Sequence, residues 1–70
     1  MKVISDDRFW NLVDEFESGR QTKTEACDII IDEYKHANSK DLDQAFADVN
    51  LLLKGNATKR QYNYLKQKLA

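Results

Sequence analysis

Proline is absent from this 70-residue sequence, and glycine, cysteine and histidine together account for only four residues. The one cysteine, Cys27, excludes an internal disulfide, and so few Cys and His residues leave no set with the spacing of a zinc site. No run approaches the ~20 apolar residues that a membrane-spanning helix needs, and acids follow Met1 too closely for a signal peptide. We therefore expect a cytoplasmic protein without disulfide, metal, cofactor or membrane segment.

Length and composition favour one small helical domain over residues 1–70. A chain this short buries only about 60% of the surface that its unfolded form exposes, so its stability margin is thin. Charged residues make up 33% of the sequence. Without proline, and with glycine scarce, this composition favours helices over a sheet or a disordered tail.

Apolar residues recur at helical spacing in four segments, which predicts helices near 6–18, 23–37, 40–54 and 58–69. Ser5 is the expected N-cap of the first helix, and Asn38 or Ser39 is the expected entry to the third. Gly19 and Gly55 stand where the first and third helices should stop, in the left-handed conformation that glycine adopts without a Cβ penalty.

A repeat of 36 residues links the two halves. The segment GRQTKTE from Gly19 and the segment GNATKRQ from Gly55 share a glycine, a threonine three residues later, and an acid or amide three residues after that. Thr22 with Glu25, and Thr58 with Gln61, have the spacing of capping boxes. The sequence thus predicts an all-α, compact four-helix domain of two consecutive αα-hairpins, near 6–37 and 40–69.

The second hairpin resembles a known family. From Leu52 the sequence is LLKGNATKRQYNYLKQKLA, which is similar to the short C-terminal domain called SHOCT at six positions: Gly55, Thr58, Gln61, Tyr62, Lys66 and Leu69. It departs from the family's pattern at Gln61, where an acid is usual, and at Lys59 and Arg60, where acids are common. The resemblance covers about a quarter of the chain, and implies a helical hairpin with a role in assembly or attachment in bacterial proteins.

Signatures of catalysis are missing, because no phosphate-binding glycine loop, HExxH or GxSxG is present. His36 falls at the expected end of a helix, where a cation complements the dipole. Cys27 lies on an apolar stripe, which indicates a small buried side chain instead of a nucleophile. We expect no enzymatic activity and no catalytic residue.

Apolar residues exceed what one core needs. Ile29–Ile31 and Leu51–Leu53 each sweep about 200° around a helix at ~100° per residue. One interpretation is that the second and third helices are nearly surrounded. The other is an exposed patch that binds a partner protein or a second copy of the chain, with four candidate residues: Trp10, Ile31, Leu51 and Tyr64.

Charge is segregated along the chain. Residues 1–53 have a balance of −6 and residues 54–70 a balance of +5, which together give the formal net charge of −1. Lys59 and Arg60 fall in the first turn of a helix, where the dipole disfavours cations. Acids of the first three helices are possible counter-ions: Asp14, Glu17 or Asp48.

The alternative is an anion or nucleic-acid site on the last helix, formed by Thr58, Lys59, Arg60, Lys66 and Lys68. The inverse, an acidic face that mimics DNA, is also open. Our hypothesis is a small bacterial or phage-type regulator, inhibitor or adaptor that binds another protein. Nucleic-acid binding is the second hypothesis, and a homodimer stays open.

Overall fold

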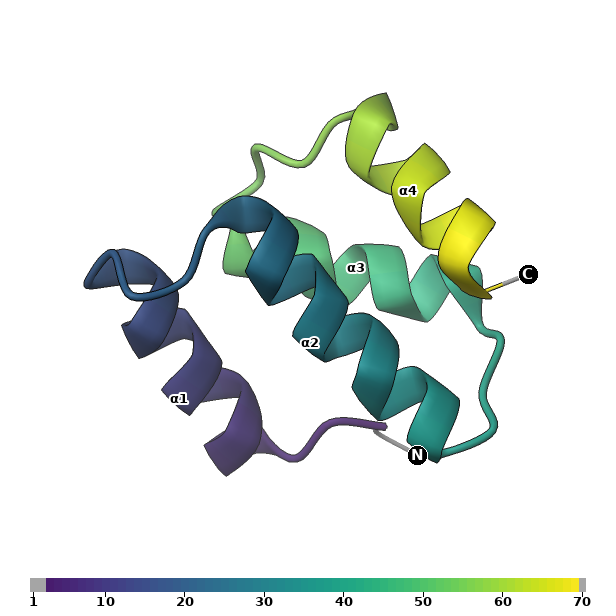
Figure 1. Cartoon of the computed structure of the whole chain (residues 1–70), viewed down its shortest axis with the longest axis horizontal. Helices are drawn as coiled ribbons and strands as arrows, with labels where there is room; N and C mark the ends of the chain where they lie inside the picture. The colour runs from purple at the N-terminus through teal and green to yellow at the C-terminus, as the bar shows by residue number, and fades with distance from the viewer. Residues whose placement is uncertain (1–2, 70) are drawn as a thin grey trace.

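The computed structural model describes residues 3–69 and forms four α-helices within them: α1 (Asp6–Glu17), α2 (Lys23–His36), α3 (Leu42–Leu52) and α4 (Lys59–Leu69) (Figure 1). No strand occurs in this part of the chain. The prediction of an all-α four-helix domain is confirmed, and each helix end lies within two residues of its expected position. None of the helices formed by residues 3–69 has the length and apolar character that crossing a bilayer requires.

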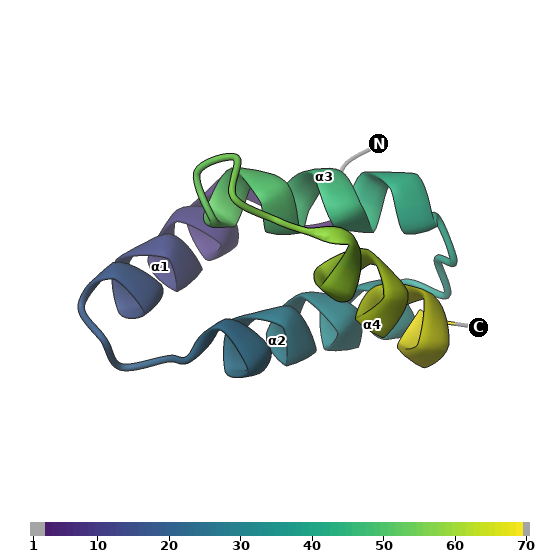
Figure 2. The ribbon, with the colours of Figure 1, turned by 90° about the horizontal axis from the view of Figure 1, so that it is seen from above.

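The second helix occupies the centre of the arrangement. It packs against α1, α3 and α4, and α3 also packs against α4. The contacts of α1 with α2 and of α3 with α4 are those of the two expected hairpins. Figures 1 and 2 show α2 and α4 running in the same direction on one face, with α3 behind them. The starts of α2 and α4 therefore lie at one end of the molecule and their ends at the other.

The core is drawn from all four helices. Its most deeply buried large side chains are Tyr34, Ile30, Leu52, Leu65 and Val49. From α1 it takes Phe9, Leu12 and Val13, which lie at the spacing of one helical stripe. The buried side chains of α2 form one broad face, from Ala26 to Tyr34, which meets the buried residues of α3.

Side chains cap the helix starts much as the sequence indicates. Ser5 Oγ accepts from the Arg8 amide at 3.2 Å. The Thr22 box is complete, because Glu25 Oε1 accepts from the Thr22 amide at 3.0 Å and Thr22 Oγ1 from the Glu25 amide at 3.1 Å. The capping box at Thr58 is a variant. Gln61 Oε1 accepts hydrogen bonds from both the amide (2.8 Å) and the hydroxyl (2.6 Å) of Thr58. Thr58 Oγ1 then accepts from the Arg60 amide at 3.3 Å.

Two expected turn assignments are wrong by a small shift. The N-cap of α3 is Asp41, whose carboxylate accepts from the Gln44 amide, and not Asn38 or Ser39. Asn38 instead ends α2 with a φ of 55°. In α3, Lys54 takes the stop position with a φ of 56°, one residue ahead of Gly55, which is itself left-handed as expected, with a φ of 82°.

Three helices end in the same hydrogen-bond pattern. In α1 the Gly19 amide donates to the Phe16 carbonyl and the Arg20 amide to the Glu15 carbonyl, which is the Schellman arrangement. Asn38 and Lys54 occupy the place of Gly19 at the ends of α2 and α3. The two glycines of the repeat thus stand one place apart in this pattern, and the connections differ in length, with five residues at 18–22 and six at 53–58.

Replacing Gly19 by alanine should destabilise the fold by about 1–2 kcal/mol, because a Cβ is unfavourable in the left-handed region. Nothing lies within 4 Å of the position that this Cβ would take, so the cost arises from its φ of 82° and not from a clash. Urea denaturation followed by circular dichroism measures the change. Gly19→Asn is the matched control and should lose less stability, since asparagine tolerates this conformation. Equal losses of stability in the two variants would contradict the explanation.

A hydrogen bond ties α2 to α3 at the edge of the core. Tyr34 is fully buried, and its hydroxyl donates to Asp48 Oδ2 at 2.5 Å. Gln44 also donates to Asp48, at 3.3 Å. Burial, and next the hydrogen bond to Asp48, raises the pKa of Tyr34 well above its ordinary value of 10.0. The hydroxyl therefore stays protonated in the folded protein when free tyrosine ionises.

Tyr34→Phe should lower the free energy of unfolding by about 1–2 kcal/mol, because it removes a hydrogen bond to a charged group and keeps the ring. Tyr62→Phe is the control, since the Tyr62 hydroxyl forms no hydrogen bond within residues 3–69. A raised pKa in the folded state means stability that is present below pH 10 and is lost as the pH rises further. Wild type should therefore lose more stability above pH 10 than Tyr34→Phe does; parallel losses would contradict this role.

Candidate protein-binding site

Trp10 and Leu51 are the large hydrophobic side chains that residues 3–69 leave exposed, at 56% and 60%. Trp10 follows the buried Phe9, and a turn of ~100° per residue carries it off the core stripe of α1. Leu51 precedes the buried Leu52 and Leu53 and is carried off the core of α3 in the same way. Both exposures agree with the sequence prediction.

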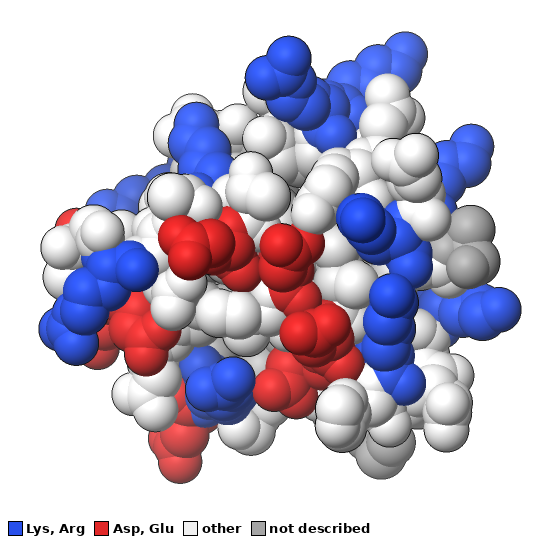
Figure 3. Space-filling model, viewed as in Figure 1, with Lys and Arg blue, Asp and Glu red and all other residues white. Residues whose placement is uncertain are grey.

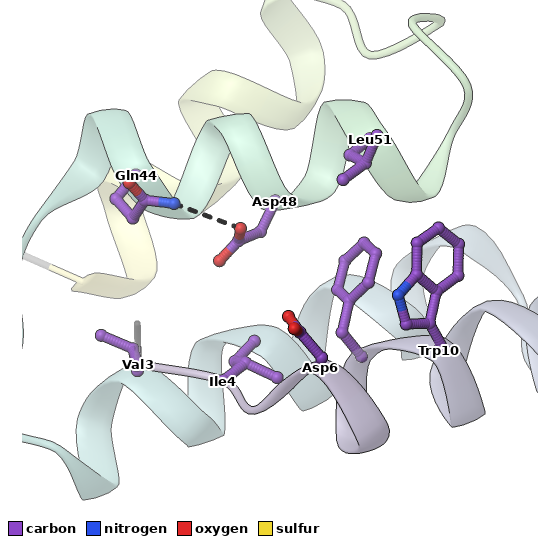
Figure 4. A pocket seen from close by; sticks show the side chains of 8 residues that line it. Val3, Ile4, Asp6, Trp10, Gln44, Asp48 and Leu51 are labelled. Carbon is purple, nitrogen blue, oxygen red and sulfur yellow. Dashed lines mark hydrogen bonds between the residues drawn. The ribbon is translucent and has the colours of Figure 1, made fainter. Parts of the chain in front are cut away.

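The two side chains border one hollow between α1 and α3, of about 110 Å³ (Figure 4). It exists because α1 packs mainly on α2 and leaves a gap toward α3. Phe9 meets Trp10 edge to face, with 5.4 Å between ring centroids, which fixes the indole at the rim. The hollow is lined by Val3, Ile4, Asp6, Phe9, Trp10, Gln44, Asp48 and Leu51.

The carboxylates of the hollow lie between two apolar parts, with Val3 and Ile4 on one side and Trp10 and Leu51 on the other (Figure 4). Figure 4 shows the carboxylates of Asp6 and Asp48 directed from α1 and α3 into the space between the helices. Asp48 is held by Tyr34 and Gln44. Both charged residues among the described lining residues are thus acids, so the hollow fits an apolar side chain accompanied by a cation.

Ile31 does not belong to this site. The sequence placed it in the exposed patch, but it is only 3% exposed and lies in the core. The expectation is wrong because α2 is packed on by three other helices, so Ile30 and Ile31 are both buried. The helix is not surrounded, however, because Asp28, Asp32 and Lys35 on its other face stay exposed.

Tyr64 is half-buried and lies apart from the hollow. Its hydroxyl donates to Asp28 Oδ1, thirty-six residues earlier in the sequence, and Lys68 Nζ lies 5.6 Å from the ring centroid. The hydrogen bond to Asp28 is the main cause that raises the pKa of Tyr64. The ring thus packs α4 against α2, and it is not brought together with Trp10 and Leu51.

The residues of the alternative anion site are spread along α4. Thr58, Lys59 and Arg60 stand at its start and Lys66 and Lys68 near its end, all exposed. Of the three expected counter-ions, Glu17 pairs with Lys54 at 3.1 Å, and neither Asp14 nor Asp48 forms an ion pair with Lys59 or Arg60 within residues 3–69. The ion pairs among residues 3–69 join Arg8 to Glu33 and Lys54 to Glu17, so they leave Lys59 and Arg60 out. Figure 3 shows basic side chains over α4 beside acidic ones over α2.

The chemistry of Cys27 is that of a structural thiol. It is 2% exposed, and burial, with Asp28 as a second cause, raises its pKa. A buried thiol that stays protonated is a poor nucleophile. No group of three or more His, Cys, Asp or Glu residues in the described part of the chain is placed to hold a metal ion.

The sequence interpretation missed the contribution of Val3 and Ile4. Ile4 is buried and, with Phe9, borders the hollow. Ile4 directly precedes the N-cap Ser5, and Phe9 is the fourth residue of α1, which are the positions of a hydrophobic staple. An apolar residue before a serine cap was therefore the signal that could have found it.

No family model matches the chain, and comparisons with curated proteins and with solved structures likewise give no match.

Proposed function

We propose that this protein binds another protein through the hollow between α1 and α3. The observation that carries the proposal is the joint exposure of Trp10 and Leu51 on facing helices. Large apolar side chains left at a concave surface are typical of interaction sites, and aromatic anchors contribute most of the binding energy. The proposed role is that of a non-enzymatic regulator, inhibitor or adaptor in the cytoplasm of a bacterium or phage-infected cell.

The chemistry of the hollow defines the partner segment. An aromatic or aliphatic side chain would contact Trp10, Phe9 and Leu51, and a neighbouring Lys or Arg would face the carboxylate of Asp48. The protein-binding proposal agrees with the resemblance of residues 52–70 to SHOCT, which implies assembly or attachment.

Selection of a displayed peptide library on the wild-type protein tests the proposal. Enriched peptides should combine an apolar anchor with a cation, and binding should shift the emission of Trp10, which is the single tryptophan of the chain. Trp10→Ala and Leu51→Ala should each lower the affinity for a labelled peptide by about 30-fold, which is the effect of losing ~2 kcal/mol at a central anchor.

Asn11→Ala is the matched control, because Asn11 is exposed on α1 next to Trp10 and does not line the hollow. Its affinity should equal that of wild type, and the circular dichroism of all variants should be unchanged. Peptides that bind the Trp10→Ala/Leu51→Ala double variant as well as wild type would reject the hollow as the site.

Nucleic-acid binding through α4 is the second candidate. It is favoured by one observation: Lys59, Arg60, Lys66 and Lys68 are all exposed and outside the ion pairs formed among residues 3–69. Phosphate-driven binding depends on such cations and weakens steeply with salt.

Lys59→Glu/Arg60→Glu should remove a salt-sensitive gel shift of single-stranded or duplex DNA at about 50 mM salt, where phosphate contacts are strong. Arg8→Glu/Arg20→Glu makes the same change in charge on and just after α1, away from α4, and should retain the shift. No shift by wild type at this salt concentration would eliminate the candidate.

A further inference from the structure

Lysines from three separate segments converge on two adjoining shallow hollows, of about 250 and 190 Å³. The first is lined by Lys35, Asn38, Ser39, Lys40, Lys68 and Leu69, and the second by Lys40, Leu42, Lys66 and Leu69. Lys40 and Leu69 border both. The end of α4, the start of α3 and the loop after α2 meet at the right-hand side of Figure 1. We call the group of Lys35, Lys40, Lys66 and Lys68 the lysine surface.

The four lysines are exposed, and the ion pairs within residues 3–69 include none of them. No described acid lines either hollow. The nearest acids along the chain are Asp41, beside Lys40, and Glu33, two residues before Lys35. The Asp41 carboxylate caps α3 by accepting from the Gln44 amide, and Glu33 pairs with Arg8. His36, which follows Lys35, is also exposed. The local charge is therefore predominantly positive.

Helix dipoles explain only part of this cluster. Lys35 lies in the last turn of α2, and Lys66 and Lys68 in the last turn of α4, where cations are favourable by about 0.3–1 kcal/mol each. Lys40 has no such role, because it directly precedes the N-cap Asp41 at the positive end of α3. A cation is unfavourable at that end of a helix, so the helix dipoles do not account for Lys40. An anion from outside the chain would account for it.

We propose that the lysine surface binds an acidic segment of a partner protein that carries an aliphatic side chain. The floor of the hollows is apolar, since Leu42 is half-buried and Leu69 is buried, while the rim is cationic. A segment with glutamates or aspartates around a leucine complements both features. The surface shares no residue with the Trp10–Leu51 hollow, so the proposal goes beyond the proposed function and does not depend on it.

The lining favours a protein over a nucleic acid. Single-stranded nucleic acids are bound by aromatic side chains on which bases stack, and no aromatic residue lines either hollow. No arginine lines either hollow, so none is placed to read base edges in two-point contacts. The lysines also form a compact group around leucines instead of a stripe that follows a phosphate backbone.

The test is fluorescence anisotropy with a labelled short peptide of glutamates and leucines, patterned to place the leucines on one helical face. Wild type should bind it at low salt and less well as salt rises. Lys40→Glu/Lys66→Glu should weaken binding about tenfold or more, because each reversal replaces an attraction with a repulsion. Lys40→Gln/Lys66→Gln should weaken it less, and this milder variant protects the test against misfolding.

Lys23→Glu/Lys59→Glu is the matched control, since it makes the same charge change at the opposite ends of α2 and α4. It should bind within about twofold of wild type. Loss of binding as large as that of Lys40→Glu/Lys66→Glu would show a general charge effect and overturn the proposal. So would the absence of binding, or equal binding of a glutamate–serine peptide. Tighter binding of oligothymidine, lost in Lys40→Glu/Lys66→Glu, would overturn it in favour of a nucleic acid.

Discussion

The burial of α2 among the other helices is the constraint from which the rest of the structure follows. Ala26, Ile30 and Tyr34 have no exposed surface, and Cys27 and Ile31 almost none. A chain of this length without a disulfide must concentrate its apolar surface in this way to fold at all. Because α1 uses its stripe on α2, it meets α3 only weakly, and the hollow bordered by Trp10 and Leu51 is the gap that results.

Turn chemistry made the fold predictable from sequence. Ser5 and Thr22 combine a side-chain acceptor with a nearby acid, and Gly19 supplies a left-handed residue, so these helix limits were local properties. Where the predictions shifted, another residue filled the same role. Asn38 and Lys54 adopt left-handed conformations that glycine would adopt more readily, and the hydrogen bonds of the helix ends hold them there.

The candidate site was less predictable, because exposure depends on how each helix is rotated and on its number of neighbours. Trp10 stands next to the stripe of α1, and the helical angle alone indicated its exposure. Ile31 and Leu51 could not be decided in this way, since three successive isoleucines or leucines cover too wide an arc to show which one faces outward. Only the packing of the helices buries Ile31 and leaves Leu51 exposed.

The gathering of lysines at one end of the molecule follows from the parallel direction of α2 and α4. This arrangement puts two helix ends, and the lysines that complement them, together at one end of the molecule. Lys40 joins them from the loop that the Asp41 cap holds in place, so the lysine surface depends on the fold and not on one basic segment. The acids that border the Trp10–Leu51 hollow lie on α1 and α3. Two surfaces of opposite charge, lined by different residues, would let the proposed adaptor distinguish two partners by charge as well as by shape.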